Sequence, residues 1–247
     1  MKLQMANSCR HHLVLLPGLD GSGHLFEPLL SVLTTAFEAS VVRFPADRPI
    51  SQRDMLGCIR SVIPWGHPYV VVAESSSGPL ALKFVEAQRE DIKAVVLCAS
   101  FVTNPIAHAS ASSPLQWATS LISKPWYDRA LTPELVREKL LGEDAPDNLV
   151  EKTTETLRAL KPEVWSSRVK LILGADARQE LLACERPILY LQPTEDKFVS
   201  STALEEIRRI KPSVKSATLK GPHALLQRNP REALEAIRSF LDNLPGS

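Results

Sequence analysis

Three consecutive serines, Ser75, Ser76 and Ser77, separate an apolar run from a stretch with helical spacing in VVAESSSGPLAL, residues 71–82. A strand that ends in small residues and turns at once into a helix forms a sharp elbow, which lifts one side chain above a sheet. A serine hydroxyl in that place can attack a carbonyl carbon if a neighbouring base removes its proton. The segment therefore raises the question of which serine is a nucleophile.

Steric crowding on such an elbow selects Ser75. The residues two before and two after the nucleophile are pressed together by the strained backbone, so both must be small. For Ser75 these neighbours are Ala73 and Ser77, whereas a turn centred on Ser76 would press the bulky Glu74 into the same space. From the turn alone, a serine that only caps the following helix is the more common alternative.

Two later apolar runs are each followed by a residue that could assist Ser75, first an orienting acid and then a base. Asp196 lies in PTEDKFVS, just after the run 187–193, and His223 lies in KGPHALLQRNP, after the run 214–220. Functional groups of open α/β sheets gather beyond the carboxyl ends of the strands. We therefore predict that His223 is the general base and then acid for Ser75, and that Asp196 orients its imidazole ring.

The glycine-bearing loop PGLDGSG, residues 17–23, can supply donors for the negative charge of a tetrahedral intermediate. The backbone N–H groups of Leu19 and Ser76 are the predicted oxyanion donors. A phosphate cradle is the weaker alternative, because the loop lacks both the GxxxxGK[ST] lysine and the full GxGxxG spacing. Asp20, in the same loop, is a candidate substrate-binding residue.

Six apolar or β-branched runs have the length of strands, and segments with helical spacing lie between most of them. Most of these runs are nearly unbroken in hydrophobicity, as strands covered by helices on both faces should be. We therefore predict an α/β fold with a mostly parallel sheet of about six strands. The predicted strands are 12–18, 39–45, 69–75, 94–100, 187–193 and 214–220, and the predicted helices are 52–63, 79–90, 202–210 and 231–244.

The interval 101–185 breaks this alternation, because it contains no convincing strand. Pro133 and Pro162 each suit the first turn of a helix, and Thr132 is placed to cap one of them. We predict a helical cap insertion here, which leaves residues 1–100 and 186–247 as the core. The insertion holds three of the four tryptophans, which either line a substrate pocket or pack the insertion against the sheet: Trp117, Trp126 and Trp165.

The composition argues against several kinds of binding partner and cellular location. Lys and Arg total 29 against 28 for Asp and Glu, so the net charge of +1 favours neither nucleic acid nor an anionic membrane surface. No apolar run reaches the length of about 18 residues expected of a membrane span, and the short N-terminal run does not resemble a signal peptide. The four cysteines form no ligand pair, so we expect reduced thiols, no metal site and a cytoplasmic location: Cys9, Cys58, Cys98 and Cys184.

Together, the segments PGLDGSG, AESSSGP, PTEDKFVS and GPHALLQRNP resemble the α/β-hydrolase superfamily, specifically bacterial single-domain esterase-like members with a helical cap. The order serine, aspartate, histidine is that of the superfamily, and the resemblance covers essentially the whole chain. Pro17-Gly18 departs from the usual His-Gly before the oxyanion position, and Ala73 and Ser77 replace the two elbow glycines. The nucleophilic aspartate of dehalogenases and epoxide hydrolases is absent from the elbow.

The resemblance implies a serine hydrolase that cleaves a small-molecule carboxylic ester through an acyl-enzyme, without a cofactor. Cleavage of a thioester, cleavage of the methyl ester of a carrier-bound acid, and acyl transfer are alternatives within the same chemistry. A non-catalytic small-molecule-binding protein on the hydrolase scaffold is the alternative of another class. The sequence decides neither the acyl and alcohol groups nor the oligomeric state.

We predict that Ser75→Ala abolishes ester turnover, by about a million-fold in kcat, and stoichiometric labelling by a fluorophosphonate. Ser76→Ala should keep most of the activity because alanine retains the backbone N–H, and Ser77→Ala should do so because alanine is small. Rates and labelling of the three purified variants test this. An active Ser75→Ala beside an inactive Ser76→Ala would place the nucleophile one residue later.

Overall fold

A parallel sheet forms the centre of the protein in a computed structural model that describes residues 11–88, 91–105 and 131–245. Within these residues it has six strands in the order β2-β1-β3-β4-β5-β6, and every neighbouring pair is parallel. This confirms the predicted α/β fold, and each strand overlaps a predicted run. The strands are β1 (His11–Leu16), β2 (Phe37–Val41), β3 (Tyr69–Glu74), β4 (Ile92–Cys98), β5 (Ile188–Pro193) and β6 (Lys215–Leu219).

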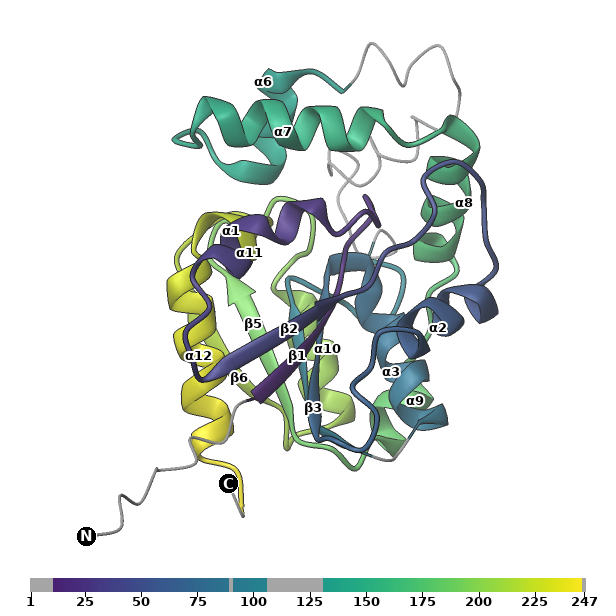
Figure 1. Cartoon of the computed structure of the whole chain (residues 1–247), viewed down its shortest axis with the longest axis vertical. Helices are drawn as coiled ribbons and strands as arrows, with labels where there is room; N and C mark the ends of the chain where they lie inside the picture. Colours follow the sequence, from purple (N-terminus) through teal and green to yellow (C-terminus); the bar gives the residue numbers. More distant parts are fainter. Residues whose placement is uncertain (1–10, 89–90, 106–130, 246–247) are drawn as a thin grey trace, which may run out of the picture.

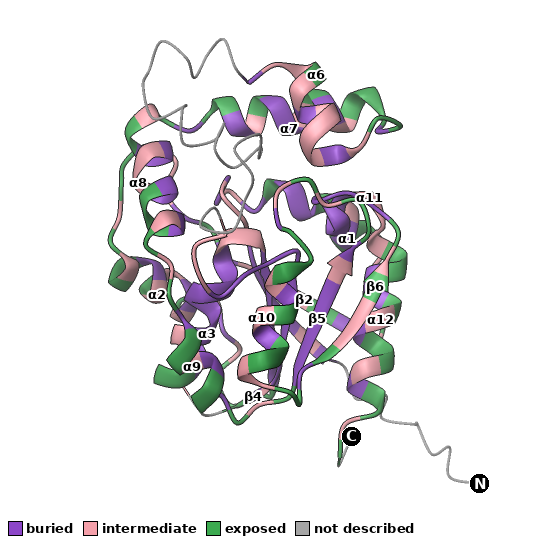
Figure 2. Cartoon of the chain, turned by 180° about the vertical axis from the view of Figure 1, so that it is seen from behind, coloured by how far each residue is buried: buried purple, intermediate pink, exposed green. Residues whose placement is uncertain are grey.

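Helices cover both faces of the sheet, as its mostly apolar central strands require. Figure 1 shows the two helical layers, and Figure 2 shows buried residues along the central strands. Residues of α2 (Gln52–Arg60), α3 (Gly78–Ala87), α9 (Arg178–Ala183) and α10 (Thr202–Ile210) pack into the core on one face. The other face is covered by residues of α1 (Glu27–Ser31), α11 (Leu225–Arg228) and α12 (Pro230–Asp242). The short helix η1 (His24–Phe26) directly precedes α1.

The interval 101–185 is helical where the structure describes it. It contains α6 (Pro133–Val136), the π-helical turn η3 (Arg137–Leu141), α7 (Asp147–Arg158), α8 (Pro162–Leu173) and α9. Its described residues form no strand, only an isolated antiparallel bridge between Thr103 and Asp176. The Thr132 side chain caps α6 by accepting from the backbone N–H of Leu135 at 3.3 Å. In Figure 1, α6 and α7 lie beyond the carboxyl ends of the strands.

The helical interval contributes most of one hydrophobic cluster, which Ala224, Leu19 and Ala46 of the core also join. Leu141, Val150, Leu157 and Trp165 are buried in it together with other apolar side chains of α6, α7 and α8. Its division from the core as a cap remains a prediction. Among the described residues, no helix is both long enough and apolar enough to cross a membrane.

The topology of the sheet brings two loops side by side. Strand β1 pairs with β2 on one side and with β3 on the other, so the chain leaves β1 toward one edge and later returns to its opposite side. Open α/β sheets have a crevice at such a reversal, beyond the carboxyl ends of the strands. The loop 17–23 after β1 and the serines after β3 therefore meet there.

We predict that Gly78→Ala destabilises the protein by about 1–3 kcal/mol, because the site has no room for a methyl group. A Cβ at Gly78 would lie 1.9 Å from Ser100 Oγ and 3.2 Å from the Phe101 carbonyl oxygen. Ser100 Oγ cannot turn away without losing its hydrogen bond to Ser75 O. Denaturant unfolding measures the change in the free energy of unfolding.

Gly57→Ala is the matched control, since Gly57 lies inside α2 and a Cβ there would meet nothing within 4 Å. Alanine should stabilise this helix by about 0.5–1 kcal/mol. Equal changes in the two variants would contradict the packing described at Gly78.

Candidate active site

The backbone at Ser75 is strained, and neighbouring groups hold it in place. Strand β3 ends at Glu74, and Ser75, the first residue of the short helix η2 (Ser75–Ser77) that leads into α3, adopts a left-handed conformation with φ of 51°. Such a conformation costs a non-glycine residue about 1–3 kcal/mol and persists only where its surroundings enforce it. Here Ser100 Oγ donates to Ser75 O at 2.6 Å. Of the three serines, all in the described part of the chain, only Ser75 has a positive φ.

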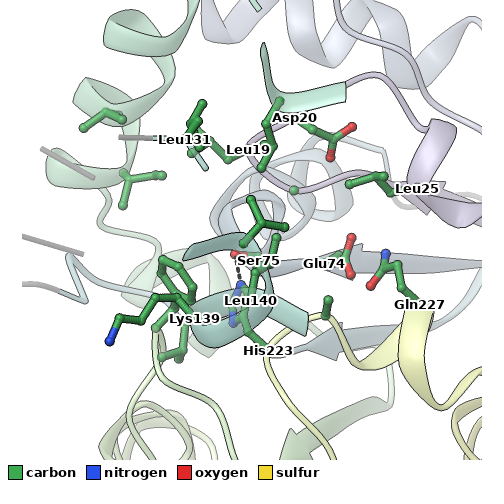
Figure 3. A pocket seen from close by; sticks show the side chains of 18 of the residues that line it. Leu19, Asp20, Leu25, Glu74, Ser75, Leu131, Lys139, Leu140, His223 and Gln227 are labelled. Atoms are coloured by element: carbon green, nitrogen blue, oxygen red, sulfur yellow. Dashed lines mark hydrogen bonds between the residues drawn. The ribbon is translucent and has the colours of Figure 1, made fainter. Parts of the chain in front are cut away.

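His223 lies between Ser75 and Asp196. His223 Nε2 is 2.9 Å from Ser75 Oγ, and His223 Nδ1 is 2.9 Å from each carboxylate oxygen of Asp196 (Figure 3 shows the serine contact). With the Nδ1 proton donated to Asp196, Nε2 is left as the acceptor for the Ser75 hydroxyl. The predicted base and acid are thus brought into one hydrogen-bonded chain with the serine, although 148 residues separate Ser75 from His223.

Asp196 is held rigidly in its loop. Its Oδ1 accepts from the backbone N–H groups of Phe198 at 2.7 Å and Val199 at 2.9 Å. The Phe198 ring also packs against the His223 ring, with centroids 5.1 Å apart. The neighbouring Glu195 is exposed, and the carboxylate that contacts the imidazole is that of Asp196.

Burial and charge act on His223 in opposite directions. Burial lowers its pKa, but the charge and hydrogen bond of Asp196, together with the charge of Glu74, outweigh burial and raise the pKa above 6.5. Glu74 itself is buried directly before the serine. Burial raises its pKa to about 7 and Asp20 adds to the rise, against the hydrogen bonds from Gln227 and the Gly18 N–H.

The loop 17–23 is bonded directly to the elbow. Ser77 Oγ donates to Pro17 O at 2.5 Å, and a Cβ at Gly18 would lie 3.4 Å from Ser75 Cβ. Ser77 therefore does more than leave room on the turn, and its effect on activity stays a prediction. Its hydroxyl satisfies a carbonyl of the loop, and Ser77→Ala would leave that acceptor unpaired at a cost of about 1–3 kcal/mol.

Leu19 and Ser76, whose amides are the predicted oxyanion donors, directly follow Gly18 and Ser75, and a Cβ at Gly18 would lie 3.4 Å from Ser75 Cβ. Leu19 N–H donates to no other described residue, and neither does Ser76 N–H outside its own helix. Their role as an oxyanion hole stays a prediction.

An apolar pocket opens on Ser75 and His223 (Figure 3). Trp165 lines it and is also packed in the cluster of the helical interval, so its role in substrate binding stays a prediction, and Trp117 and Trp126 lie outside the described residues. Asp20 also lines it, but its carboxylate accepts from the Ser22 N–H and hydroxyl at 2.9 and 2.6 Å. The other lining residues include Leu25, Phe101, Leu131, Leu135, Val136, Leu140, Leu157, Val169 and Ile172.

Sequence reasoning missed three polar residues around the site. Arg168 of α8 is buried and donates to carbonyls of the loop 17–23, and Glu74 and Gln227 form a buried pair beside the pocket. The sequence argument for Ser75 uses only the size of Glu74. No motif marks Arg168, because its partners are about 150 residues away in the chain.

Comparison with proteins of known structure identifies the fold. No protein-family model matches the chain, and no curated protein does. Solved structures match it over nearly all its length. A bromoperoxidase from Bacillus anthracis is 17% identical, with a TM-score of 0.79, over 95% of this chain and 92% of that one. The esterase RhEst1 from Rhodococcus sp. ECU1013 is 17% identical, with a TM-score of 0.78, over 97% and 93%.

An enol-lactonase from Burkholderia xenovorans LB400 is 14% identical, with a TM-score of 0.76, over 95% of this chain and 92% of that one. The chain therefore has the α/β-hydrolase fold, which it shares with esterases and other hydrolases. Identities this low show the fold and leave the reaction to be argued from the site.

We predict that kcat/KM for an ester rises with pH and is half-maximal above pH 6.5. His223 must be neutral to accept the serine proton, and its environment raises its pKa, so the active form appears only as pH passes that higher value. A profile from pH 5 to 9 measures this. Asp196→Asn should move the midpoint to lower pH and cut kcat by about ten-thousand-fold.

Glu195→Gln is the control, because it removes a charge one residue away from Asp196 on an exposed side chain. Its profile and rate should match those of the unaltered protein. A rate that is flat across the whole range would count against histidine as the base.

Proposed function

We propose that this protein is a serine hydrolase that cleaves carboxylic esters through an acyl-enzyme on Ser75. The observation that carries the proposal is the hydrogen-bonded chain from Ser75 through His223 to Asp196, which lies at the wall of an apolar pocket. The order of these groups, each held by its own strand-end loop, is what nucleophilic catalysis requires.

In the first half of the proposed reaction, Ser75 Oγ attacks the ester carbonyl carbon while His223 Nε2 takes its proton. Asp196 stabilises the resulting imidazolium and holds the ring in the correct orientation. The carbonyl oxygen becomes an oxyanion that accepts from the N–H groups of Leu19 and Ser76. The bond to the alkoxy oxygen then breaks, and His223 gives its proton to the leaving alcohol.

In the second half, a water molecule attacks the acyl carbon of the Ser75 ester. His223 removes a proton from the water, and the same oxyanion donors stabilise the second tetrahedral intermediate. Collapse of this intermediate breaks the bond to Ser75 Oγ, which recovers its proton from His223. The products are a carboxylic acid and the free enzyme.

The pocket supports a substrate with an apolar acyl or alcohol group. Aliphatic and aromatic side chains of α7 and α8 supply much of its lining, among them Leu157, Trp165 and Ile172. Lys139 reaches the lining too, but its ammonium is paired with the Glu138 carboxylate. We further propose that the helical interval 101–185 acts as a cap whose side chains contact the substrate and determine which substrates bind. The cytoplasmic location stays a prediction.

Two kinds of alternative remain open to experiment. Thioester cleavage, cleavage of a carrier-bound methyl ester and acyl transfer would use the same three residues. A binding protein without activity would not need His223 within 2.9 Å of the serine oxygen. Labelling by a fluorophosphonate separates an enzyme from such a binding protein, since only an activated serine reacts.

We predict that kcat/KM for p-nitrophenyl esters increases by about tenfold for each two methylenes added to the acyl chain until the pocket ends. The reason is that each buried methylene contributes about 0.8 kcal/mol. Esters from two to about twelve carbons test the dependence. Trp165→Ala should change the chain-length profile, because this side chain lines the pocket.

Trp65→Ala is the matched control, since Trp65 is 72% exposed and does not line the pocket. Its profile should be unchanged. A flat dependence on chain length, identical in both variants, would show that Trp165 serves packing and that the pocket does not bind the acyl chain.

A further inference from the structure

Arg168 on α8 connects the helical interval to two loops at the carboxyl edge of the sheet. Its side chain is buried, with 7% exposed. Nη1 donates to Leu19 O at 2.8 Å and to Asp20 O at 2.5 Å. Nη2 donates to Pro45 O at 2.8 Å and to Phe44 O at 3.4 Å. One guanidinium group therefore bonds to the loop after β1 and to the loop after β2.

The loop after β1 is shaped to receive this guanidinium group. A Cβ at Gly21 would lie 2.4 to 2.7 Å from three guanidinium atoms, so only a glycine leaves room for them. Gly21 also has a φ of 63°, and its carbonyl accepts from Phe44 N–H at 2.7 Å. Burial raises the pKa of Asp20, and the hydrogen bonds from Ser22 and the charge of Arg168 oppose that rise only in part. The two buried charges thus partly compensate each other.

The hydrogen bonds of this loop determine where the Leu19 N–H points. Gly21 N–H donates to Gly18 O at 3.1 Å, which fixes the direction of the peptide plane that joins Gly18 to Leu19. Because a trans peptide directs its N–H opposite to its C=O, the Leu19 N–H points away from that turn. Arg168 fixes the next two carbonyls, and Glu74 accepts from the Gly18 N–H on the side of the elbow.

We propose that Arg168 is a positioning residue for the oxyanion hole: it holds the loop 17–23 so that the Leu19 N–H is directed at the developing oxyanion beside Ser75. This rests on the proposed function. The guanidinium contacts carbonyls behind the loop and acts on the reaction only through it. Its position on α8 makes the geometry of the oxyanion hole depend on the helical interval being in place.

A kinetic comparison of Arg168→Gln with Lys170→Gln tests the proposal. Lys170 is an exposed cation on the same helix, so its variant removes the same charge without touching the loop. We expect Arg168→Gln to lower kcat by about a hundredfold, as the loss of one oxyanion donor does, with KM nearly unchanged. The kcat of Arg168→Lys should lie between those of Arg168→Gln and the unaltered enzyme, because an ammonium group lacks the planar fork that reaches both loops. Lys170→Gln should match the unaltered enzyme.

Hydrogen exchange of the peptide amides in residues 17–23 gives a second readout that does not depend on turnover. Exchange there should be faster in Arg168→Gln and unchanged in Lys170→Gln. Raised KM with normal kcat, unchanged exchange, or a lower melting temperature with normal kcat would each overturn the proposal. If Arg168→Gln does not fold, Arg168→Lys carries the same comparison.

The two proposals fail in different ways. If the unaltered protein neither hydrolyses esters nor reacts with a fluorophosphonate, the proposed function is wrong, and the role of Arg168 in an oxyanion hole is wrong with it. The exchange measurement then still decides whether Arg168 holds the loop. If the protein is active and Arg168→Gln keeps its kcat, only the positioning role is wrong.

Discussion

The left-handed backbone at Ser75 is the constraint on which the rest of the site depends. A φ of 51° turns the chain sharply out of β3 and raises the hydroxyl above the sheet, at a cost that the surrounding contacts must offset. Ser100 holds the Ser75 carbonyl, and Gly78 lets Ser100 approach that closely. Because these contacts come from the next strand end, the elbow is a property of the assembled sheet, not of the serine segment alone.

The loop after β1 shows how such a site is assembled from distant parts. Its peptide groups are bonded on one side by Ser77 and Glu74 of the elbow and on the other by Arg168 of α8. A glycine-rich loop loses much conformational entropy on ordering, so it needs several fixed partners to keep one geometry. In this protein most of those partners are side chains that bond to backbone groups, joined by the Phe44 N–H that donates to Gly21 O.

Buried carboxyl groups dominate the electrostatics around His223. Asp196 bonds to the ring, and the charge of Asp20 adds to the rise in the pKa of Glu74. Negative charge near the imidazole favours its protonated form, which appears during the proposed reaction. Burial raises the pKa of Glu74 to about 7, its charge helps to raise the pKa of His223, and His223 in turn lowers that of Glu74, so protonation of either group affects the other.

The sequence by itself determined the local features: six strands, the helices after them, the Thr132 cap and the small residues around Ser75. These follow from hydrophobic periodicity and steric size, which neighbouring residues carry. The sequence also offered Asp196 and His223, since strand-end loops of a parallel sheet share one edge. Only the tertiary structure decided the bonds of Ser77 and Arg168. The partner of Ser77 is 60 residues away and those of Arg168 are 123 to 149 residues away, and no local pattern records which carbonyl a buried donor will reach once the loops have packed.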